Sequence, residues 1–311
     1  MINCQGITKK YAHLTAVDNI SFRVSPGEVL GFLGPNGAGK TTTMRIIAGF
    51  VTPTAGRALV SGFDAESQGM EVKQRIGYLP EGAPSYPEMT PRSFLEFTAE
   101  VRGLSKARQA TRLEEVFTLL HLDSVLEQSI DTLSKGYKRR VALAQAILHD
   151  PEVLILDEPT DGLDPNQKHE VRELINQMSK NKIIVISTHL LEEVEAVCNR
   201  AIIIANGHIL VDDTPANLKS RSRFHNAVSL KLVDSSQLEQ VRSEIEALTE
   251  VTATEVDSNN NRLTAFPVPD RTPLTAISEL ATAQGWEFSE FHLESGRLDE
   301  VFRTITGDEN A

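Results

Sequence analysis

The chain has 311 residues and a formal net charge of −12, and 40% of its residues are hydrophobic and 24% charged. This composition is typical of a folded protein of about two domains and excludes a disordered, collagen-like or coiled-coil protein. The residues from Phe224 onward include 6 basic and 16 acidic side chains, a net charge of −10, so no nucleic-acid partner is expected.

Two cysteines, Cys4 and Cys198, are too few for a disulfide framework or a zinc cluster. The sequence contains no stretch that resembles a signal peptide, and no apolar run reaches the roughly 20 residues that a membrane-spanning helix needs. We therefore expect a soluble, cytosolic-type protein.

The first 60 residues are expected to form strands. Val17–Val24 alternates apolar and polar residues, and Val29–Leu33 is a continuous apolar run, typical of a buried strand. A glycine-rich loop then precedes a helix expected at about 41–48. Further strands are predicted at Arg57–Ser61 and Arg75–Leu79.

Between about residues 90 and 149, apolar residues recur with a period near 3.6, which predicts three amphipathic helices. Strand patterns return at Val153–Leu156 and Ile183–Ile186, with a helix expected at about 165–178 between them. Continuous apolar strands that alternate with helices indicate a parallel sheet covered on both faces. We expect an α/β domain at residues 1–220 that carries a helical subdomain at about 85–148.

The composition changes after Thr214, and the polar, basic segment Lys219–His225 is expected to be a linker. Beyond it, the patterns predict a strand–helix–strand–strand–helix–strand order and a last helix, which fits a small ferredoxin-like α+β domain at residues 225–311. These elements are expected at Ala227–Leu232, Ser236–Leu248, Val251–Val256, Arg262–Val268, Pro273–Gln284, Glu287–Leu293 and Leu298–Ile305.

One segment between a predicted strand and a predicted helix matches the phosphate-loop motif GxxxxGK[ST]: Gly34, Pro35, Asn36, Gly37, Ala38, Gly39, Lys40 and Thr41. Small residues let successive backbone N–H groups point at phosphates, and the start of a helix adds partial positive charge. Lys40 is expected to neutralise the β- and γ-phosphate oxygens, and the Thr41 hydroxyl to coordinate Mg²⁺. The motif predicts nucleotide binding.

Two carboxylates, Asp157 and Glu158, follow the predicted strand Val153–Leu156. Adjacent residues of a strand face opposite ways, so the two side chains can have different roles. Asp157 is expected to hold Mg²⁺ through water, and Glu158 to orient and deprotonate an attacking water. Acidic residues at a strand end are often only solvated caps, but their pairing with a phosphate loop favours the catalytic interpretation.

Three further segments resemble the ATP-binding subunits of ABC transporters: LSKGYKRR at Leu133–Arg140, LILDEPTDGLDP at Leu154–Pro165 and IVISTHLLEE at Ile184–Glu193. The resemblance covers about residues 1–215 and implies a P-loop ABC cassette, with N-terminal antiparallel strands beside the parallel core. The chain looks most like the ATPases of ABC-2-type exporters. Their gliding-motility and nitrous-oxide copper-maturation members have similar LPE and LSKGY variants and a similar C-terminal ending.

The resemblance implies roles for the matching residues. Tyr11 falls where an aromatic side chain stacks on adenine, and the Walker A loop extends from Gly34 to Thr42. Ser134 and Gly136 belong to the signature motif, which in this family contacts the γ-phosphate held by the other subunit. Asp161–Asp164 is the loop that crosses the dimer interface.

His189 corresponds to the switch histidine of the family, whose imidazole could hydrogen-bond the γ-phosphate or the attacking water. A histidine at a strand end can also have no catalytic role. Four basic residues around the signature motif either add positive charge near the phosphate or form an ordinary solvated face: Lys135, Lys138, Arg139 and Arg140.

Two positions depart from the usual family pattern. Glu81 stands where most members have a glutamine that ligates Mg²⁺; a carboxylate can still ligate the metal, but it adds negative charge beside the phosphates. In the signature motif, Lys135 replaces a glycine and Tyr137 a glutamine, while Ser134 and Gly136 are kept.

We therefore predict an ATP-binding and ATP-hydrolysing subunit of an ABC-2-type exporter that uses Mg²⁺ and pairs head to tail as a homodimer. It would act through a separate membrane permease, docked by the helical subdomain and the Glu81 loop at the cytoplasmic face of the plasma membrane. The C-terminal domain would serve dimerisation or regulation.

The alternative is a soluble, non-transport ABC ATPase that acts on a ribosome or another macromolecular complex. Such proteins usually join two cassettes in one chain, whereas this sequence has one phosphate loop. A GTPase is disfavoured because the sequence lacks an Asn-Lys-x-Asp motif, and a chromosome ATPase because it lacks long heptad segments.

Overall fold

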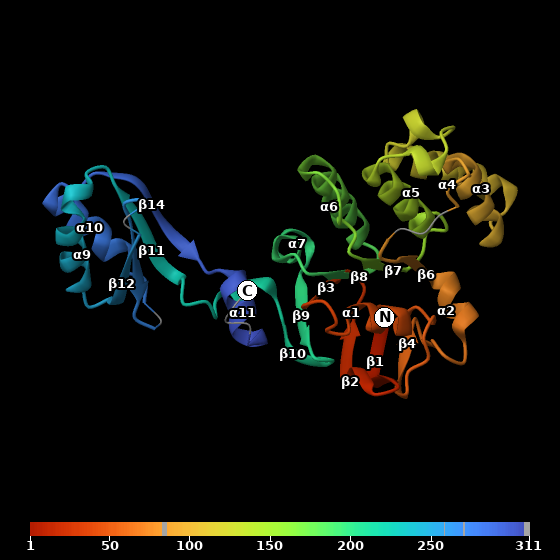
Figure 1. Ribbon diagram of the computed structural model, residues 1–311, viewed down its shortest axis with the longest axis horizontal. Coiled ribbons are helices and arrows are strands. Elements are labelled where there is room, and N and C mark those ends of the chain that lie inside the picture. The colour runs from red at the N-terminus through yellow and green to blue at the C-terminus, as the bar shows by residue number, and fades with distance from the viewer. Residues whose placement is uncertain (83–85, 258, 270, 308–311) are drawn as a thin grey trace. The chain divides into compact units, whose positions relative to one another are not determined.

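The computed structural model describes residues 1–82, 86–257, 259–269 and 271–307 (Figure 1). Contacts along the chain divide it into two compact units, Met1–Thr214 and Pro215–Ala311. Each unit has its own buried apolar cluster. Residue 85, where the helical subdomain is predicted to begin, lies outside the described residues.

The first unit contains an antiparallel sheet with the strand order β2-β1-β4-β5. Along β2 the buried positions Ile20, Phe22 and Val24 alternate with exposed ones, as the sequence pattern predicts, while two less buried residues separate Val17 from Ile20. The strands are β1 (Ile2–Tyr11), β2 (Leu14–Val24), β4 (Ala55–Val60) and β5 (Phe63–Asp64).

The second sheet of this unit has six strands in the order β10-β9-β3-β8-β7-β6. Its strands pair in parallel except for the β9–β10 hairpin, and every residue of β3, β7 and β8 is buried. This burial explains their continuous apolar sequences. The strands are β3 (Val29–Leu33), β6 (Ile76–Leu79), β7 (Val153–Asp157), β8 (Ile183–Thr188), β9 (Arg200–Ala205) and β10 (His208–Asp213).

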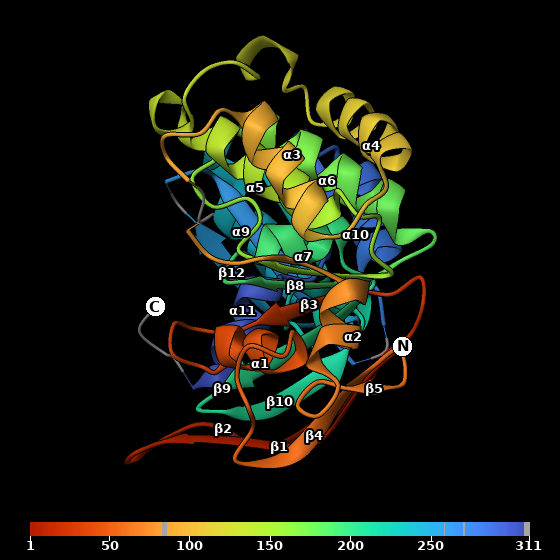
Figure 2. The same cartoon turned by 90° about the vertical axis from the view of Figure 1, so that its right-hand side faces the viewer.

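Helix α1 (Lys40–Ile47) packs Met44, Ile46 and Ile47 into a cluster that contains residues of both sheets. Figures 1 and 2 show α1 on one side of the six-stranded sheet and α5, α6 and α7 on the other. Both cysteines, Cys4 on β1 and Cys198 after α7, are buried.

The helical subdomain consists of α3 (Pro91–Val101), α4 (Lys106–Leu119) and α5 (Lys135–Ile147), which agree with the three predicted helices. Polar caps fix where they begin: Thr90 forms a capping box with Ser93, and Ser105 and Ser134 cap α4 and α5. The remaining helices of the unit are α2 (Gly69–Arg75), α6 (Pro165–Ser179), α7 (Leu191–Val197) and the short 3₁₀ helices η1 (Asp123–Val125) and η2 (Ile130–Thr132).

The second unit is a four-stranded antiparallel sheet with the order β12-β13-β11-β14 and the βαββαβ succession of a ferredoxin-like fold. Leu230, Leu263, Val241 and Ile277 join the sheet and its helices in one apolar cluster. The elements are α8 (Pro215–Lys219), β11 (His225–Leu232), η3 (Ser235–Gln237), α9 (Leu238–Glu246), β12 (Val251–Asp257), β13 (Arg262–Pro267), α10 (Leu274–Gln284), β14 (Phe288–Ser295) and α11 (Leu298–Thr306).

The expectation of a linker at Lys219–His225 is wrong. Lys219 ends α8, Ser222 and Phe224 are buried, and His225 begins β11. Phe224 packs edge-on against Phe266, with ring centroids 5.3 Å apart, and the guanidinium of Arg297 lies 3.7 Å from the Phe224 centroid. Phe224 therefore anchors this segment in the core, although the basic residues around it suggest an exposed segment.

Candidate active site

The predicted phosphate loop connects the end of β3, which is fully buried, to the start of α1, which is buried along one side. Gly39 caps the helix with φ of 108°, a conformation that favours glycine. A Cβ atom at Gly39 would lie 2.5 Å from the carbonyl oxygen of Ala16, and one at Gly34 would lie 2.2 Å from that of Ile204. Close backbone approach therefore requires glycine at both positions.

Lys40 is the first residue of α1, and only 6% of it is exposed. Its Nζ atom donates to the carbonyl oxygens of Gly34, at 2.5 Å, and Pro35, at 3.1 Å, so the ammonium group lies within the loop. Burial lowers the pKa of Lys40, while the carboxylates of Glu158, Asp157 and Glu81 oppose this shift. A buried cation held in a loop of amides is suited to binding a polyphosphate.

Asp157 is the last residue of β7 and is 1% exposed. One of its carboxylate oxygens accepts a hydrogen bond from the Ser187 hydroxyl on β8, and the other, Oδ2, is buried without a hydrogen-bond partner in the structure. A buried carboxylate oxygen without a partner is costly, so this atom fits a role toward a bound cation.

The residues present fit Mg²⁺, which is usually bound by one or two carboxylates together with substrate phosphates and waters. Over the described ranges, no group of three or more His, Cys, Asp or Glu side chains forms a metal cage. If the ion binds, the residues of this chain that would hold it together with the nucleotide are Asp157, Thr41 and Glu81.

Glu158 follows β7 in a left-handed backbone conformation, with φ of 50°, which is unusual for a residue other than glycine. Its N–H donates to the carbonyl oxygen of Ser187 at 3.0 Å. The Nδ1 atom of His189 lies 3.0 Å from each carboxylate oxygen of Glu158. The structure thus brings together the predicted base and the predicted switch histidine, from the ends of neighbouring strands.

A cavity of about 360 Å³ collects most of the predicted nucleotide site. Tyr11 lies at its edge, 44% exposed, with Lys9 Nζ 5.0 Å from the ring centroid. Leu14 and Ala16 also line the cavity, although the sequence patterns gave no reason to single them out. The predicted residues that line it are Tyr11, Pro35, Asn36, Gly37, Ala38, Gly39, Lys40, Thr41, Thr42, Glu81 and Glu158.

Two predicted residues, Ser134 and Gly136, do not line this cavity. They lie at the start of α5, where the Ser134 hydroxyl oxygen accepts from the N–H of Tyr137 at 3.3 Å. A Cβ atom at Gly136 would lie 2.2 Å from the side-chain oxygen of Gln167 on α6. The hydroxyl proton of Ser134 can still be donated to a ligand.

The four basic residues of the signature segment have different environments. Lys138 donates to the carbonyl oxygen of Asp131 at 2.8 Å, and Arg140 forms an ion pair with Glu170 at 2.5 Å. Arg139, by contrast, is only 6% exposed, so it is not part of a solvated basic face. Its spacing, three residues after Gly136 and four before Leu143, places it on the buried stripe of α5, a signal that sequence reasoning missed.

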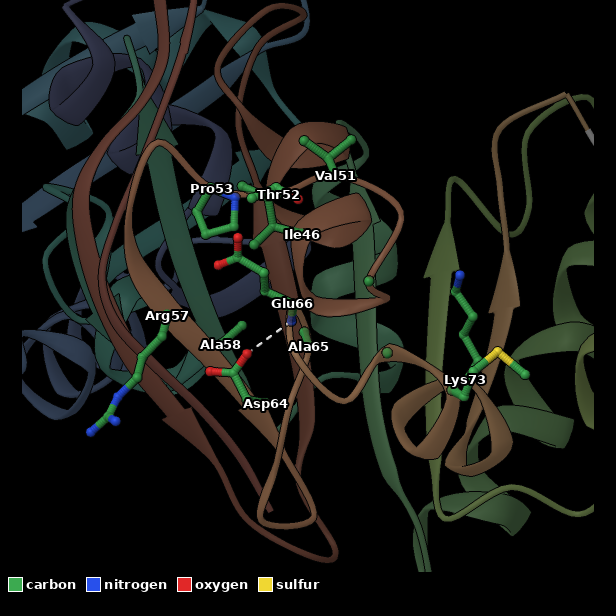
Figure 3. Close-up of a pocket in the computed structure, with 13 residues that line it drawn as sticks. Ile46, Val51, Thr52, Pro53, Arg57, Ala58, Asp64, Ala65, Glu66 and Lys73 are labelled. Atoms are coloured by element: carbon green, nitrogen blue, oxygen red, sulfur yellow. Dashed lines mark hydrogen bonds between the residues drawn. The ribbon is translucent and has the colours of Figure 1, made fainter.

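A separate hollow of about 260 Å³ lies beside the end of α1, between β4 and α2, and is shown in Figure 3. Within it, the N–H of Glu66 donates to the Asp64 carboxylate at 2.9 Å, which is a local turn contact. It contains no residue of the predicted site. Elsewhere, none of the helices that the structure describes is long and apolar enough to cross a bilayer.

Comparison with known proteins identifies the same family that the sequence motifs resemble. The profile of the family described as ABC transporter matches residues 17–161. The linearmycin resistance ATP-binding protein LnrL of Bacillus subtilis (strain 168) is 32% identical over 99% of this chain and 98% of its own length. The Nod factor export ATP-binding protein I of Cupriavidus metallidurans is 31% identical over 99% of this chain and 98% of its own.

Among solved structures, one described as the ATP-binding subunit of an ABC transporter superposes with a TM-score of 0.66 and 29% sequence identity. The match covers 71% of this chain and 92% of that structure.

Proposed function

Because the chain belongs to the ATP-binding proteins of ABC transporters and is an ATPase, we propose that it powers an ABC-2-type exporter whose permease is a separate chain. The observation that carries this proposal is an exposed apolar groove that the first unit presents in addition to its nucleotide cavity. A cavity for ATP accounts for hydrolysis alone, whereas the groove supplies a surface through which hydrolysis can act on a second protein.

The groove, hereafter the docking groove, has a volume of about 910 Å³. Several of its large apolar side chains are exposed, including Phe50 at 59%, Met70 at 69% and Val101 at 70%. Large exposed apolar surface usually marks an interaction site. Its remaining lining residues include Lys73, Tyr78, Tyr86, Phe94, Phe97, Arg102, Arg108 and His149.

The form of the docking groove suits a helical cytoplasmic segment of a permease. An amphipathic helix can place its apolar face in such a groove, and basic residues at the rim can pair with acidic residues or with the helix C-terminus. Pro80, next to Glu81, also lines the groove, while Glu81 lines the nucleotide cavity. A partner bound in the groove could therefore affect the nucleotide cavity through the adjacent residues Pro80 and Glu81.

In the proposed reaction the phosphate loop and Lys40 bind the phosphates, and the Tyr11 ring supports the adenine. Glu158 accepts a proton from the attacking water, and His189 holds the Glu158 carboxylate in place. Mg²⁺, held by Thr41, Asp157 and Glu81, would neutralise charge on the phosphate oxygens.

The position of Ser134 and Gly136 outside the cavity supports a head-to-tail homodimer. In such a pair, the hydroxyl of Ser134 and the N-terminus of α5 from one copy would face the nucleotide bound by the other. ATP would join the two copies, and hydrolysis would release them. Through its permease, the dimer would lie at the cytoplasmic face of the plasma membrane.

We assign dimerisation or regulation to the second unit, on the basis of its separate core and ferredoxin-like fold. Dimerisation and ATPase rate would be compared between the full chain and a chain that ends at Thr214. If both quantities are unchanged, neither role applies.

The exporter proposal is tested by whether the chain co-purifies with a multi-span membrane protein from its native membranes. Phe97→Glu in the docking groove should prevent capture of the permease and leave basal ATPase activity within about threefold of wild type, because the groove is separate from the cavity. Leu210→Glu on β10 is the matched control, since Leu210 and Phe97 are each 43% exposed.

Capture by the control but not by Phe97→Glu supports docking through the groove. Equal capture of the permease by both variants would show that the docking groove does not bind it. Pelleting of the wild-type protein with ribosomes, without a membrane partner, would instead favour the non-transport alternative.

A further inference from the structure

The guanidinium group of Arg139 donates hydrogen bonds to four main-chain carbonyl oxygens. Nε donates to Pro159 at 3.2 Å, Nη1 to Pro80 at 3.2 Å, and Nη2 to Asp157 at 2.5 Å and to Glu158. These carbonyls belong to two segments that lie far from Arg139 in sequence. One is the three-residue turn that carries the predicted base, and the other ends one residue before Glu81.

The turn that Arg139 holds is conformationally unfavourable. The left-handed backbone of Glu158 is unfavourable for a residue with a Cβ atom, so the surrounding contacts must maintain it. On one side, the Glu158 N–H is bonded to β8 through Ser187. On the other side, Arg139 binds the carbonyl of Glu158 and those of both its neighbours.

Placing a cation here is itself costly. Burial lowers the pKa of Arg139, and the nearby carboxylates of Asp161, Asp157 and Glu158 oppose this shift. Helix α5 already buries apolar side chains, among them Val141, Leu143 and Ala144, against its surroundings. Attachment of the helix therefore does not by itself require an arginine at this position.

We propose that Arg139 is a positioning residue, which fixes the turn at Glu158 and so sets where the Glu158 carboxylate lies in the nucleotide cavity. This inference rests on the role proposed above for Glu158. Helix α5, which carries Arg139, begins at Ser134, and Ser134 would face the nucleotide of the second copy. Arg139 therefore also links that surface to Glu158, the proposed base of its own site.

Arg112 offers a matched control. Its guanidinium donates to the carbonyl oxygens of Leu148 and Ile147, at 3.0 and 2.9 Å, at the other end of α5. Arg112 therefore makes the same type of contact, guanidinium to main-chain carbonyl, but from α4 to the C-terminal end of α5 and away from the cavity. Arg112→Gln should lower the thermal stability and leave kcat within about threefold of wild type.

The test compares Arg139→Gln, Arg139→Lys and Arg112→Gln, each with and without Glu158→Gln. Both kcat and the Kd for ATP are measured for every variant, by single-turnover hydrolysis and by equilibrium binding. Arg139→Gln should lower kcat by about 10- to 100-fold and change the Kd by less than about threefold, because a displaced base impairs chemistry more than binding. Arg139→Lys should recover part of the loss, since an ammonium can still donate to these carbonyls.

In the Glu158→Gln background, Arg139→Gln should cause little further loss, because both changes affect the same step. An equal loss in both backgrounds, or a kcat within threefold of wild type, overturns the positioning role. If Arg139→Gln does not fold, Arg139→Lys is judged by the same comparison. Normal turnover of Glu158→Gln itself would overturn the proposed base, a result distinct from any behaviour of Arg139.

Discussion

His189 Nδ1 lies 3.0 Å from both carboxylate oxygens of Glu158, so one imidazole nitrogen faces the whole carboxylate. The side chain of Glu158 is 12% exposed and that of His189 is 50% exposed. When Nδ1 carries the proton of the neutral imidazole, it donates a hydrogen bond to Glu158, and Nε2 is left as an acceptor. The histidine can therefore restrain the carboxylate on one side while its other nitrogen receives a hydrogen bond.

Replacement of Glu158 by glutamine should retain ATP binding and lower hydrolysis by roughly 10²- to 10⁴-fold, because the amide cannot accept a proton from water. The variant should also accumulate as an ATP-bound dimer. Phosphate release and size-exclusion chromatography with ATP measure the two effects, with Glu66→Gln in the hollow of Figure 3 as the control. Near-normal turnover would remove Glu158 as the base.

Two substitutions at His189 should differ in effect. Alanine removes the contact with Glu158 and should lower kcat by about 10- to 100-fold, whereas glutamine can still donate to the carboxylate and should retain more activity. Steady-state kinetics at saturating ATP distinguish them. Equal activity of both variants and wild type would mean that the 3.0 Å contact has no part in turnover.

The ammonium group of Lys40 should be indispensable for nucleotide binding. Lys40→Ala keeps the backbone amides of the loop but removes the buried cation and its two contacts with the loop carbonyls, so affinity for ATP should fall by more than about 100-fold. Equilibrium binding of a fluorescent ATP analogue measures the loss. Tight binding by this variant would contradict the phosphate-cradle interpretation.

A mixture of inactive chains should recover activity if the copies pair head to tail. In a dimer of one Lys40→Ala chain and one Ser134→Ala chain, one site collects both substitutions and the other collects neither. An equal mixture should therefore regain up to about a quarter of wild-type ATPase activity, since half of random pairs are mixed. Each variant alone provides the baseline. No gain over that baseline would argue against sharing of sites.

Acid should destabilise the first unit through His149. Its Nε2 atom lies 3.1 Å from the carbonyl oxygen of Ile76, and its Nδ1 atom is buried with no hydrogen-bond partner among the residues that the structure describes. Burial lowers the pKa of His149 to about 4. Between pH 6.5 and 4 the unfolded chain binds a proton that the folded one does not, so stability falls as the pH falls through this range.

His149→Gln does not titrate, so the stability advantage of wild type over this variant should shrink by about 2 to 3 kcal/mol between pH 7 and 4.5. Urea unfolding followed by circular dichroism measures the free energies at the two pH values. If the difference in unfolding free energy between wild type and His149→Gln is the same at both pH values, His149 does not control acid stability.

Much of the fold follows from local patterns. The apolar runs of β3, β7 and β8 and the period of α3, α4 and α5 report burial directly, so their positions could be predicted to within a few residues. Helix α2 and strand β10 were not predicted, because α2 has only seven residues and buries only Val72, and β10 is only half-buried along one face.

For the candidate site, too, the sequence predicts contiguous motifs better than contacts between distant segments. The phosphate loop and the carboxylates of β7 are contiguous motifs, and the cavity contains nearly all of the loop residues. The roles of Arg139 and Phe224 depend on contacts with segments distant in sequence, and their charged surroundings suggested solvent exposure. The helical period of α5 could have indicated that Arg139 is buried, but the partners of both side chains are seen only in the tertiary structure.

The two native thiols lie in the core, and burial raises the pKa of both, that of Cys198 to about 12. Since the thiolate is the reactive form, maleimides should leave the wild-type chain almost unlabelled. A single cysteine introduced at the exposed Lys135 would then accept one fluorophore without prior removal of the native sulfur atoms. Energy transfer between two such dyes would follow the approach of paired copies in real time, in an otherwise unaltered sequence.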